Sequence, residues 1–165
     1  MKEFLAQTHI RRILKYALYM FLALVVQNML LSQVRPMGIC PMILPAVAVS
    51  VGMFAGAGGG VVFSLIMGLF ADLAFVETTV LFTVLLPLIA FGAALVSEFF
   101  INRRFFAFMG ITFAASAFTA LMQMLVTFAG DAWSTELVKT AVLQTLWSMP
   151  FSAVAYLPPA KWIKD

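Results

Sequence analysis

Asp72 is the one acidic residue that falls clearly within an apolar stretch of the chain, the position at which membrane proteins place proton relays. A relay needs further titratable groups at similar depth, and the apolar stretches supply none that is well placed. Asp72 lies about four residues from the end of its stretch, roughly 6 Å deep at 1.5 Å per residue. We therefore expect structural pairing rather than ion chemistry. The alternatives for Asp72 are a hydrogen bond to Thr78 or Thr79, an ion pair with Arg35, or a protonated carboxyl group.

Other chemistries lack the residues that they require. The only histidine, His9, belongs to a basic N-terminal segment, so neither a metal centre nor a Ser-His pair can be assembled. The glycine run GAGGG at 56–60 is not followed by the Lys and Ser or Thr of a phosphate-binding loop. The single cysteine, Cys40, excludes an internal disulfide. We expect a protein that is not an enzyme and that binds no metal or cofactor.

Small and polar residues recur every three or four positions along three apolar stretches, so each set shares one helix face. Between membrane helices, small residues allow close backbone approach, and hydroxyls and amides form hydrogen bonds across the contact. We expect these faces to pack within the protein, and the alternative is that one of them receives a partner helix or lines a pocket. The three stripes are Gly60, Ser64, Gly68 and Asp72; Ser116, Thr119, Gln123 and Thr127; and Thr140, Gln144, Ser148 and Ser152. The candidates for helix packing or partner binding are Gly60, Ser64, Gly68, Asp72, Gln123, Gln144 and Ser148.

The composition requires a lipid environment for these stretches. Of 165 residues, 64% are hydrophobic and only 10% are charged, and the mean hydropathy is +1.06. Soluble domains have about a quarter of their residues charged. A water-soluble fold of this length leaves too much surface exposed to hide so much apolar area. The net charge of +3 does not indicate a nucleic-acid partner, because the basic residues lie at the ends of the apolar stretches.

The apolar stretches predict an all-α polytopic membrane protein, with six transmembrane helices in a single domain over residues 1–165. Each crossing needs about 20 apolar residues, so little chain remains for soluble parts. The basic first 15 residues are typical of an interfacial helix or collar. GAGGG at 56–60 forms a tight hinge, Pro45 falls in a first helical turn, and the last helix ends at Pro158. The predicted helices cover residues 13–34, 42–57, 59–76, 80–101, 105–129 and 137–157.

Lys and Arg residues predict the orientation, because cytoplasmic ends of membrane helices are rich in them. Six crossings with both termini in the cytoplasm place eight of the ten basic residues inside and leave Arg35 and Lys139 outside. Adding or removing one helix would scatter the arginines over both faces. The eight inside are Lys2, Arg11, Arg12, Lys15, Arg103, Arg104, Lys161 and Lys164.

Several short motifs follow one another along the chain. The first apolar helix ends in VVQNMLLSQV, and a Gly-x-x-Pro turn follows at 38–41. A glycine hinge and the phrase GLFADL at 68–73 come next, and QTLW at 144–147 lies in the last helix. In this order, these motifs resemble the MreD family, small membrane proteins of the bacterial rod-shape system. Members of the family often carry an acid directly after the proline of the turn. Met42 stands there in this chain, so any role of that acid does not transfer.

The resemblance implies a non-enzymatic scaffold in the bacterial inner membrane, which maintains cell shape by binding partners of the cell-elongation machinery that makes peptidoglycan. The implied partners are an MreC-like single-span protein and, through it, a RodA-like glycosyltransferase, its penicillin-binding transpeptidase and MreB filaments. Membrane lipid surrounds such a protein.

A substrate-binding subunit of an energy-coupling-factor vitamin transporter is the alternative function, since these subunits have similar size, hydropathy and six-helix topology. The polar stripes that contain Gln123 and Gln144 would then line a pocket for the vitamin. The expected outer loops are short and hold few aromatic or charged groups apart from Trp133, which disfavours the capture of a polar vitamin.

Overall fold

The computed structural model describes residues 2–31, 33, 39–74, 80–99, 105–130 and 135–162, and these residues form helices with no strand among them. The all-α prediction is confirmed for this part of the chain. The helices are α1 (Lys2–Val25), the π-helix η1 (Val26–Leu31), α2 (Leu44–Ala74), α3 (Leu81–Phe99), α4 (Phe105–Gly130), α5 (Thr135–Ala155) and α6 (Leu157–Trp162).

The predicted hinge divides α2 into two helical arms at Gly56. Gly56 has φ 79° and ψ 175°, a left-handed value of φ that favours glycine. Beyond the hinge the second arm folds back on the first, and a Cβ added to Gly60 would lie 2.7 Å from the Cα atom of Gly52. Pro45 occupies the first turn of the first arm, as predicted. The hinge prediction is therefore confirmed, although α2 runs through it without an intervening loop.

Both ends of the chain are more helical than the sequence indicated. The basic N-terminal segment is continuous with the first apolar helix. α1 has 24 residues, and η1 follows it directly with 6 more. At 1.5 Å per residue this is about 45 Å, longer than the hydrocarbon core of about 30 Å. The predicted stop at Pro158 is wrong in detail. α5 ends at Ala155, and Pro158 and Pro159 lie in the first turn of α6, where a missing N–H removes no helical hydrogen bond.

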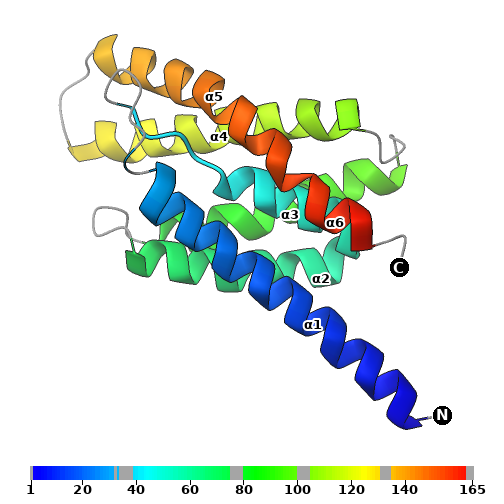
Figure 1. The fold of residues 1–165 in the computed structure, drawn as a ribbon. Helices are drawn as coiled ribbons and strands as arrows, with labels where there is room; N and C mark the ends of the chain where they lie inside the picture. The colour runs from blue at the N-terminus through cyan, green and yellow to red at the C-terminus, as the bar shows by residue number, and fades with distance from the viewer. Residues whose placement is uncertain are drawn as a thin grey trace.

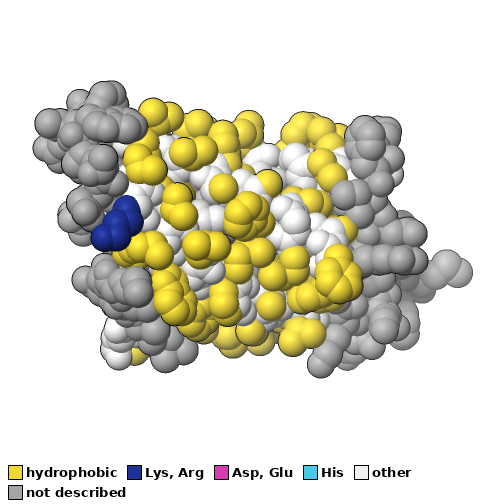
Figure 2. Space-filling model, turned by 90° about the horizontal axis from the view of Figure 1, so that it is seen from above, with side chains coloured by type: hydrophobic (Ala, Val, Ile, Leu, Met, Phe, Trp, Pro, Cys, Tyr) yellow, Lys and Arg dark blue, Asp and Glu magenta, His cyan; other side chains and the backbone are white. Residues whose placement is uncertain are grey.

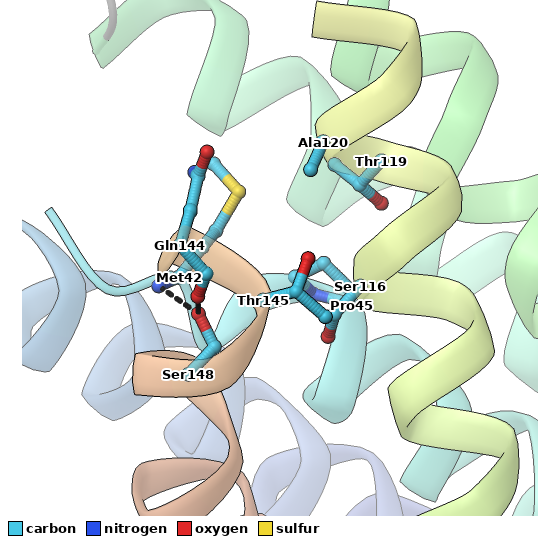
Figure 3. Close-up of a pocket in the computed structure, with 8 residues that line it drawn as sticks. All are labelled: Met42, Pro45, Ser116, Thr119, Ala120, Gln144, Thr145 and Ser148. Atoms are coloured by element: carbon cyan, nitrogen blue, oxygen red, sulfur yellow. Dashed lines mark hydrogen bonds between the residues drawn. The ribbon is translucent and has the colours of Figure 1, made fainter. Parts of the chain in front are cut away.

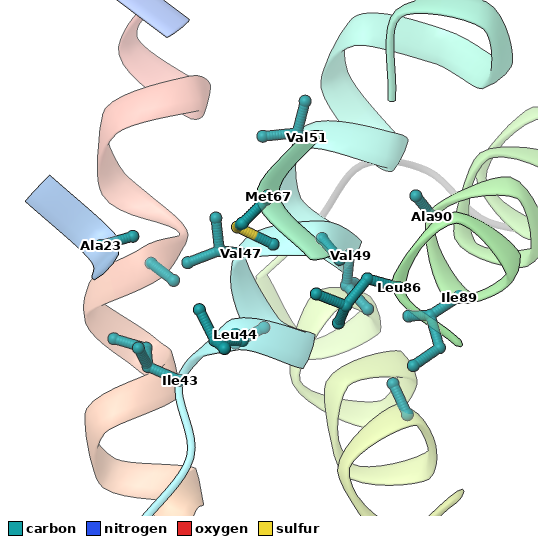
Figure 4. Packing of buried hydrophobic residues seen from close by; sticks show 14 of the residues in the cluster. Ala23, Ile43, Leu44, Val47, Val49, Val51, Met67, Leu86, Ile89 and Ala90 are labelled. Carbon is teal, nitrogen blue, oxygen red and sulfur yellow. The ribbon is translucent and has the colours of Figure 1, made fainter. Parts of the chain in front are cut away.

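The helices form two pairs that are joined through the first arm of α2. The second arm of α2 lies along α3, α4 lies along α5, and α1 crosses the bundle obliquely (Figure 1). Buried aliphatic side chains from several helices meet around the first arm, and Leu44, Val47 and Val49 are among them (Figure 4). Met67 of the second arm and Leu86 of α3 complete this core. The first arm is therefore the buried centre of the protein.

Tyr19 ties α1 to the break between α5 and α6. Its hydroxyl donates a 2.8 Å hydrogen bond to the carbonyl oxygen of Ala155, and it lies 3.2 Å from Oγ of Ser50. In a continuous helix that carbonyl would accept from the residue four positions on, which is Pro159 and has no N–H. The tyrosine supplies the missing donor.

Large apolar side chains cover the outside of the bundle. Three helices within the described residues are long and apolar enough to cross a membrane: Leu44–Ala74, Leu81–Glu98 and Phe105–Val126. Leu14–Met29 forms a shorter apolar helical stretch. The view onto α4 and α5 shows a mostly hydrophobic surface between the two ends of the bundle (Figure 2). Such a surface is compatible with a lipid environment.

Candidate functional site: a buried polar junction

Residues 39–43 run through the bundle without helical structure, and the last three of them are buried. Backbone N–H and C=O groups at this depth have no water to bond, so irregular backbone within a membrane protein requires partners from the surrounding chain. The structure supplies these partners from η1 and α5. We call the resulting cluster the polar junction, defined by Gln27, Met42, Gln123, Gln144 and Ser148.

Gln27 bonds the irregular segment on two sides. Its Nε2 donates to the carbonyl oxygen of Pro41 at 3.1 Å, and its Oε1 accepts from the backbone N–H of Ile43 at 2.8 Å. The side chain is only 2% exposed. It projects from η1, which is a π-helix. Such helices are rare in proteins, and those that occur often lie at functional sites. Gln27 therefore acts as a two-sided clip on the entry to α2.

The amide and hydroxyl groups of α4 and α5 complete the junction. Oγ of Ser148 accepts a 2.8 Å bond from the backbone N–H of Met42 and donates to the carbonyl oxygen of Gln144 at 2.6 Å. Nε2 of Gln144 donates to Oε1 of Gln123 at 3.3 Å, and Nε2 of Gln123 lies 3.9 Å from the sulfur of Met42. Three of the candidate residues predicted from sequence are thus brought together. Met42 contributes its backbone N–H and its thioether.

A small cavity of about 10 Å³ lies beside the junction, between the start of α2, α4 and α5 (Figure 3). Its walls carry hydroxyl and amide groups but no titratable group. A vitamin-sized ligand needs a pocket of about 300 Å³ or more. The cavity is lined by the two polar stripes that would form the vitamin pocket if the protein were a transporter subunit. It has room for about one water molecule. The residues that line it are Met42, Pro45, Ser116, Thr119, Ala120, Gln144, Thr145 and Ser148.

The other candidate residues lie at the contact between the second arm of α2 and α3. A Cβ added to Gly68 would contact the carbonyl oxygen of Phe82 and would lie 2.8 Å from the Cα atom of Thr83. One turn later, the carboxyl group of Asp72 accepts from the backbone N–H groups of Phe82 and Thr83 at 3.0 and 2.7 Å. It also accepts from the hydroxyl of Thr83 at 2.6 Å. Asp72 therefore caps the first turn of α3, whose N–H groups have no partner within that helix.

This geometry gives Asp72 the role of a hydrogen-bond acceptor between helices. Its expected partners Thr78, Thr79 and Arg35 lie outside the described residues. The bonds to Phe82 and Thr83 were not expected, because a cap from one helix onto another depends on tertiary structure.

The remaining two candidates, Gly60 and Ser64, also face inward. Gly60 contacts the first arm of α2 through the close approach to Gly52. Ser64 is fully buried, and its hydroxyl has no hydrogen-bond partner among the described residues. The stripe on the second arm of α2 is thus occupied by contacts within the chain.

We expect Asp72→Asn to destabilise the protein by about 1–3 kcal/mol, the cost of leaving a buried donor without a partner. The amide oxygen of asparagine still accepts, but its NH₂ group cannot accept from the second backbone N–H. Reversible unfolding in SDS, followed by circular dichroism, measures this loss. Glu98→Gln, at the exposed far end of α3, is the control and should change stability by less than about 0.5 kcal/mol. Equal stability of Asp72→Asn and the native protein would contradict the cap. Loss of cellular function at normal protein level and stability would show that the charge itself is required.

Comparison with protein-family models, curated proteins and solved structures finds no match to this chain. Within the described residues, no group of His, Cys, Asp and Glu side chains could hold a metal ion. The arrangement of the junction is one of mutual hydrogen bonding between neutral groups, which positions η1, α4 and α5 around the start of α2.

Sequence reasoning missed Gln27 as a central residue. An amide in an otherwise apolar helix is a signal, because a buried amide must find hydrogen-bond partners. The sequence could not reveal that these partners are backbone groups of residues 41 and 43, since that contact depends on the irregular path of the chain.

Proposed function

We propose that this protein is a non-enzymatic scaffold of the bacterial inner membrane, which binds an MreC-like single-span partner and thereby supports peptidoglycan synthesis by the cell-elongation machinery. The observation that carries the proposal is that the polar stripes face the interior of the protein. Ten of their twelve residues have described side chains that are buried or half-buried, and Thr140 is exposed. What remains for partners is the apolar outer surface, which is suited to binding helices within the bilayer.

We also propose that the chain crosses the membrane six times with both termini in the cytoplasm. The hinge at Gly56 divides α2 into two arms. In this proposal the two arms are separate crossings, and α1, α3, α4 and α5 are the other four. The start of α1, the end of α6, this hinge and the start of α4 lie at one end of the bundle, and the ends of α1, α2 and α4 lie at the other (Figure 1). The excess of Lys and Arg at the first end agrees with this orientation.

The motifs VVQNMLLSQV and GLFADL support the assignment to the MreD-like class more specifically than hydropathy does. Each contains one residue with a defined structural task. Gln27 in the first motif holds the irregular segment, and Asp72 in the second caps α3. A protein in which both polar residues serve internal architecture is consistent with a scaffold.

Site-specific photo-crosslinking in cells tests the proposal. A photoreactive residue would be placed at one lipid-facing position on each of five helices, and Met67, which is fully buried, serves as the control position. We expect at least one outward position to capture an MreC-like protein and Met67 to capture none. Depletion of the protein should also convert rods to rounded cells. Capture of no single-span partner together with unchanged cell shape would refute the scaffold. The outward positions are Phe21, Leu73, Val84, Leu125 and Val154.

The vitamin-transport alternative is tested on the same cells. Protein purified in mild detergent would be extracted and examined by mass spectrometry for a stoichiometric vitamin. The proposal requires that none is found, and a stoichiometric vitamin would favour the transporter subunit despite the small cavity.

A further inference from the structure

The hydroxyl of Ser116 is buried without a partner at the edge of the cavity beside the polar junction. Ser116 is 5% exposed, and its Oγ makes no hydrogen bond within the described residues. It lines the cavity together with the side chains of Thr119 and Thr145 (Figure 3). A buried hydroxyl with no partner costs free energy, so such a group next to a cavity indicates a ligand.

The size of the cavity restricts the ligand. Its volume of about 10 Å³ is close to the lower limit of about 10–15 Å³ that one water molecule needs. Empty cavities in proteins are apolar, whereas this one is lined by hydroxyl groups on two helices. A bare monovalent cation would fit by size alone. None of the lining residues carries a charge to offset its loss of hydration.

The neighbouring hydroxyl groups still have capacity to accept hydrogen bonds. Thr119 donates to the carbonyl oxygen of Ala115 at 2.8 Å, and Thr145 donates to that of Ala141 at 2.9 Å. Both donations leave lone pairs on the threonine oxygens. Of these three hydroxyl groups, Ser116 is the one whose proton is not donated to a partner among the described residues.

We propose that the cavity holds one structural water molecule, which accepts from the hydroxyl of Ser116 and donates to the hydroxyl oxygens of Thr119 and Thr145. The water joins α4 to α5 immediately behind the start of α2. Three hydrogen bonds are typical of a buried water. This inference does not depend on the scaffold function, since the site exists whichever partner the outer surface binds.

The direction of the stability change in Ser116→Ala tests the site. If the cavity is dry, removal of an unpartnered hydroxyl leaves stability unchanged or raises it. If the water is bound, the variant leaves it one bond short, and we expect the folding equilibrium constant in SDS titrations to fall roughly tenfold. Ser64→Ala is the matched comparison, because Ser64 also has an unpartnered buried hydroxyl but does not line this cavity. A loss in Ser116→Ala that exceeds any loss in Ser64→Ala supports the water. Stability equal to or above that of the native protein overturns it, and so does a loss no greater than that of Ser64→Ala.

Two measurements on the native protein are independent of the variants. A structure at a resolution that shows ordered water should contain one density peak within hydrogen-bonding distance of Oγ of Ser116, and an empty cavity would overturn the proposal. Stability should be equal in sodium and choline chloride at the same ionic strength. A specific increase with sodium would assign the cavity to a cation instead of water.

Discussion

Gly68→Leu is expected to prevent α3 from packing on the second arm of α2. Even the first added carbon would contact the carbonyl oxygen of Phe82 and lie 2.8 Å from its carbonyl carbon. These are backbone atoms, so no side-chain rotation relieves the overlap. Separation of the helices would also weaken the bonds from Asp72 to the first turn of α3. We expect a loss of at least about 3 kcal/mol, at the upper end of overpacking effects.

The chain offers a matched control for this substitution. Gly110 lies in α4, is exposed, and has no atom within 4 Å of an added Cβ. Gly110→Leu should fold normally, because its side chain would extend outward from the exposed face of α4 without meeting another atom. The two variants would be compared by monodispersity in detergent and by the SDS concentration at half-unfolding. If Gly68→Leu matches Gly110→Leu in both measurements, the close approach of α2 and α3 is wrong.

The glycine stripe on the second arm of α2 shows how far sequence reasoning reaches. A spacing of four predicted that Gly60 and Gly68 lie on a contact face, and both residues meet backbone atoms within the chain. The sequence did not indicate Gly52 as a contact residue. It packs against both Gly60 and the backbone of Ala90, so three helical segments converge on it. Only the fold reveals a residue shared between two contacts.

Local chemistry explains which features were predictable. The hinge at Gly56 follows from backbone freedom in a glycine run, and the position of Pro45 follows from its missing N–H. The turn at 38–41 was predicted from Gly38 and Pro41, but the helix was predicted to begin at residue 42 and begins at Leu44. Met42 and Ile43 are apolar and suit a helix, and their non-helical path rests on hydrogen bonds to side chains far away in the sequence. Distant hydrogen bonds of this kind leave no periodic signal in one sequence.

The internal use of polar groups has a consequence for how partners bind. Hydrogen bonds between membrane helices add modest stability, and here most of the described polar groups of the stripes are directed inward. An outer groove of about 240 Å³ between α4 and α5 is lined mainly by apolar side chains, with Ala117, Ala120 and Leu121 among them. Any partner helix at this surface would depend on shape and van der Waals contact.

Gln27→Leu is expected to disrupt the entry to α2 by removing both hydrogen bonds of the clip. The carbonyl oxygen of Pro41 and the N–H of Ile43 would remain buried without their partners. At about 1–3 kcal/mol for each unsatisfied group, the expected loss is roughly 2–6 kcal/mol. Gln27→Met, which nearly preserves the length of the side chain, should lose a similar amount, because the effect comes from hydrogen bonding and not from volume.

Gln144→Leu is the graded control for this prediction. Gln144 is half-buried, and its amide nitrogen donates one long bond, to another side chain. The expected loss is about 1 kcal/mol, because the lost bond is long, joins two half-buried side chains and leaves no backbone group unsatisfied. Both variants would be unfolded in SDS, and hydrogen exchange at residues 42–47 would report local opening. Faster exchange there in Gln27→Leu than in Gln144→Leu is the expected signature of the lost clip. Equal exchange would mean that the irregular segment is held by packing alone, and that the buried amide of Gln27 does not determine its path.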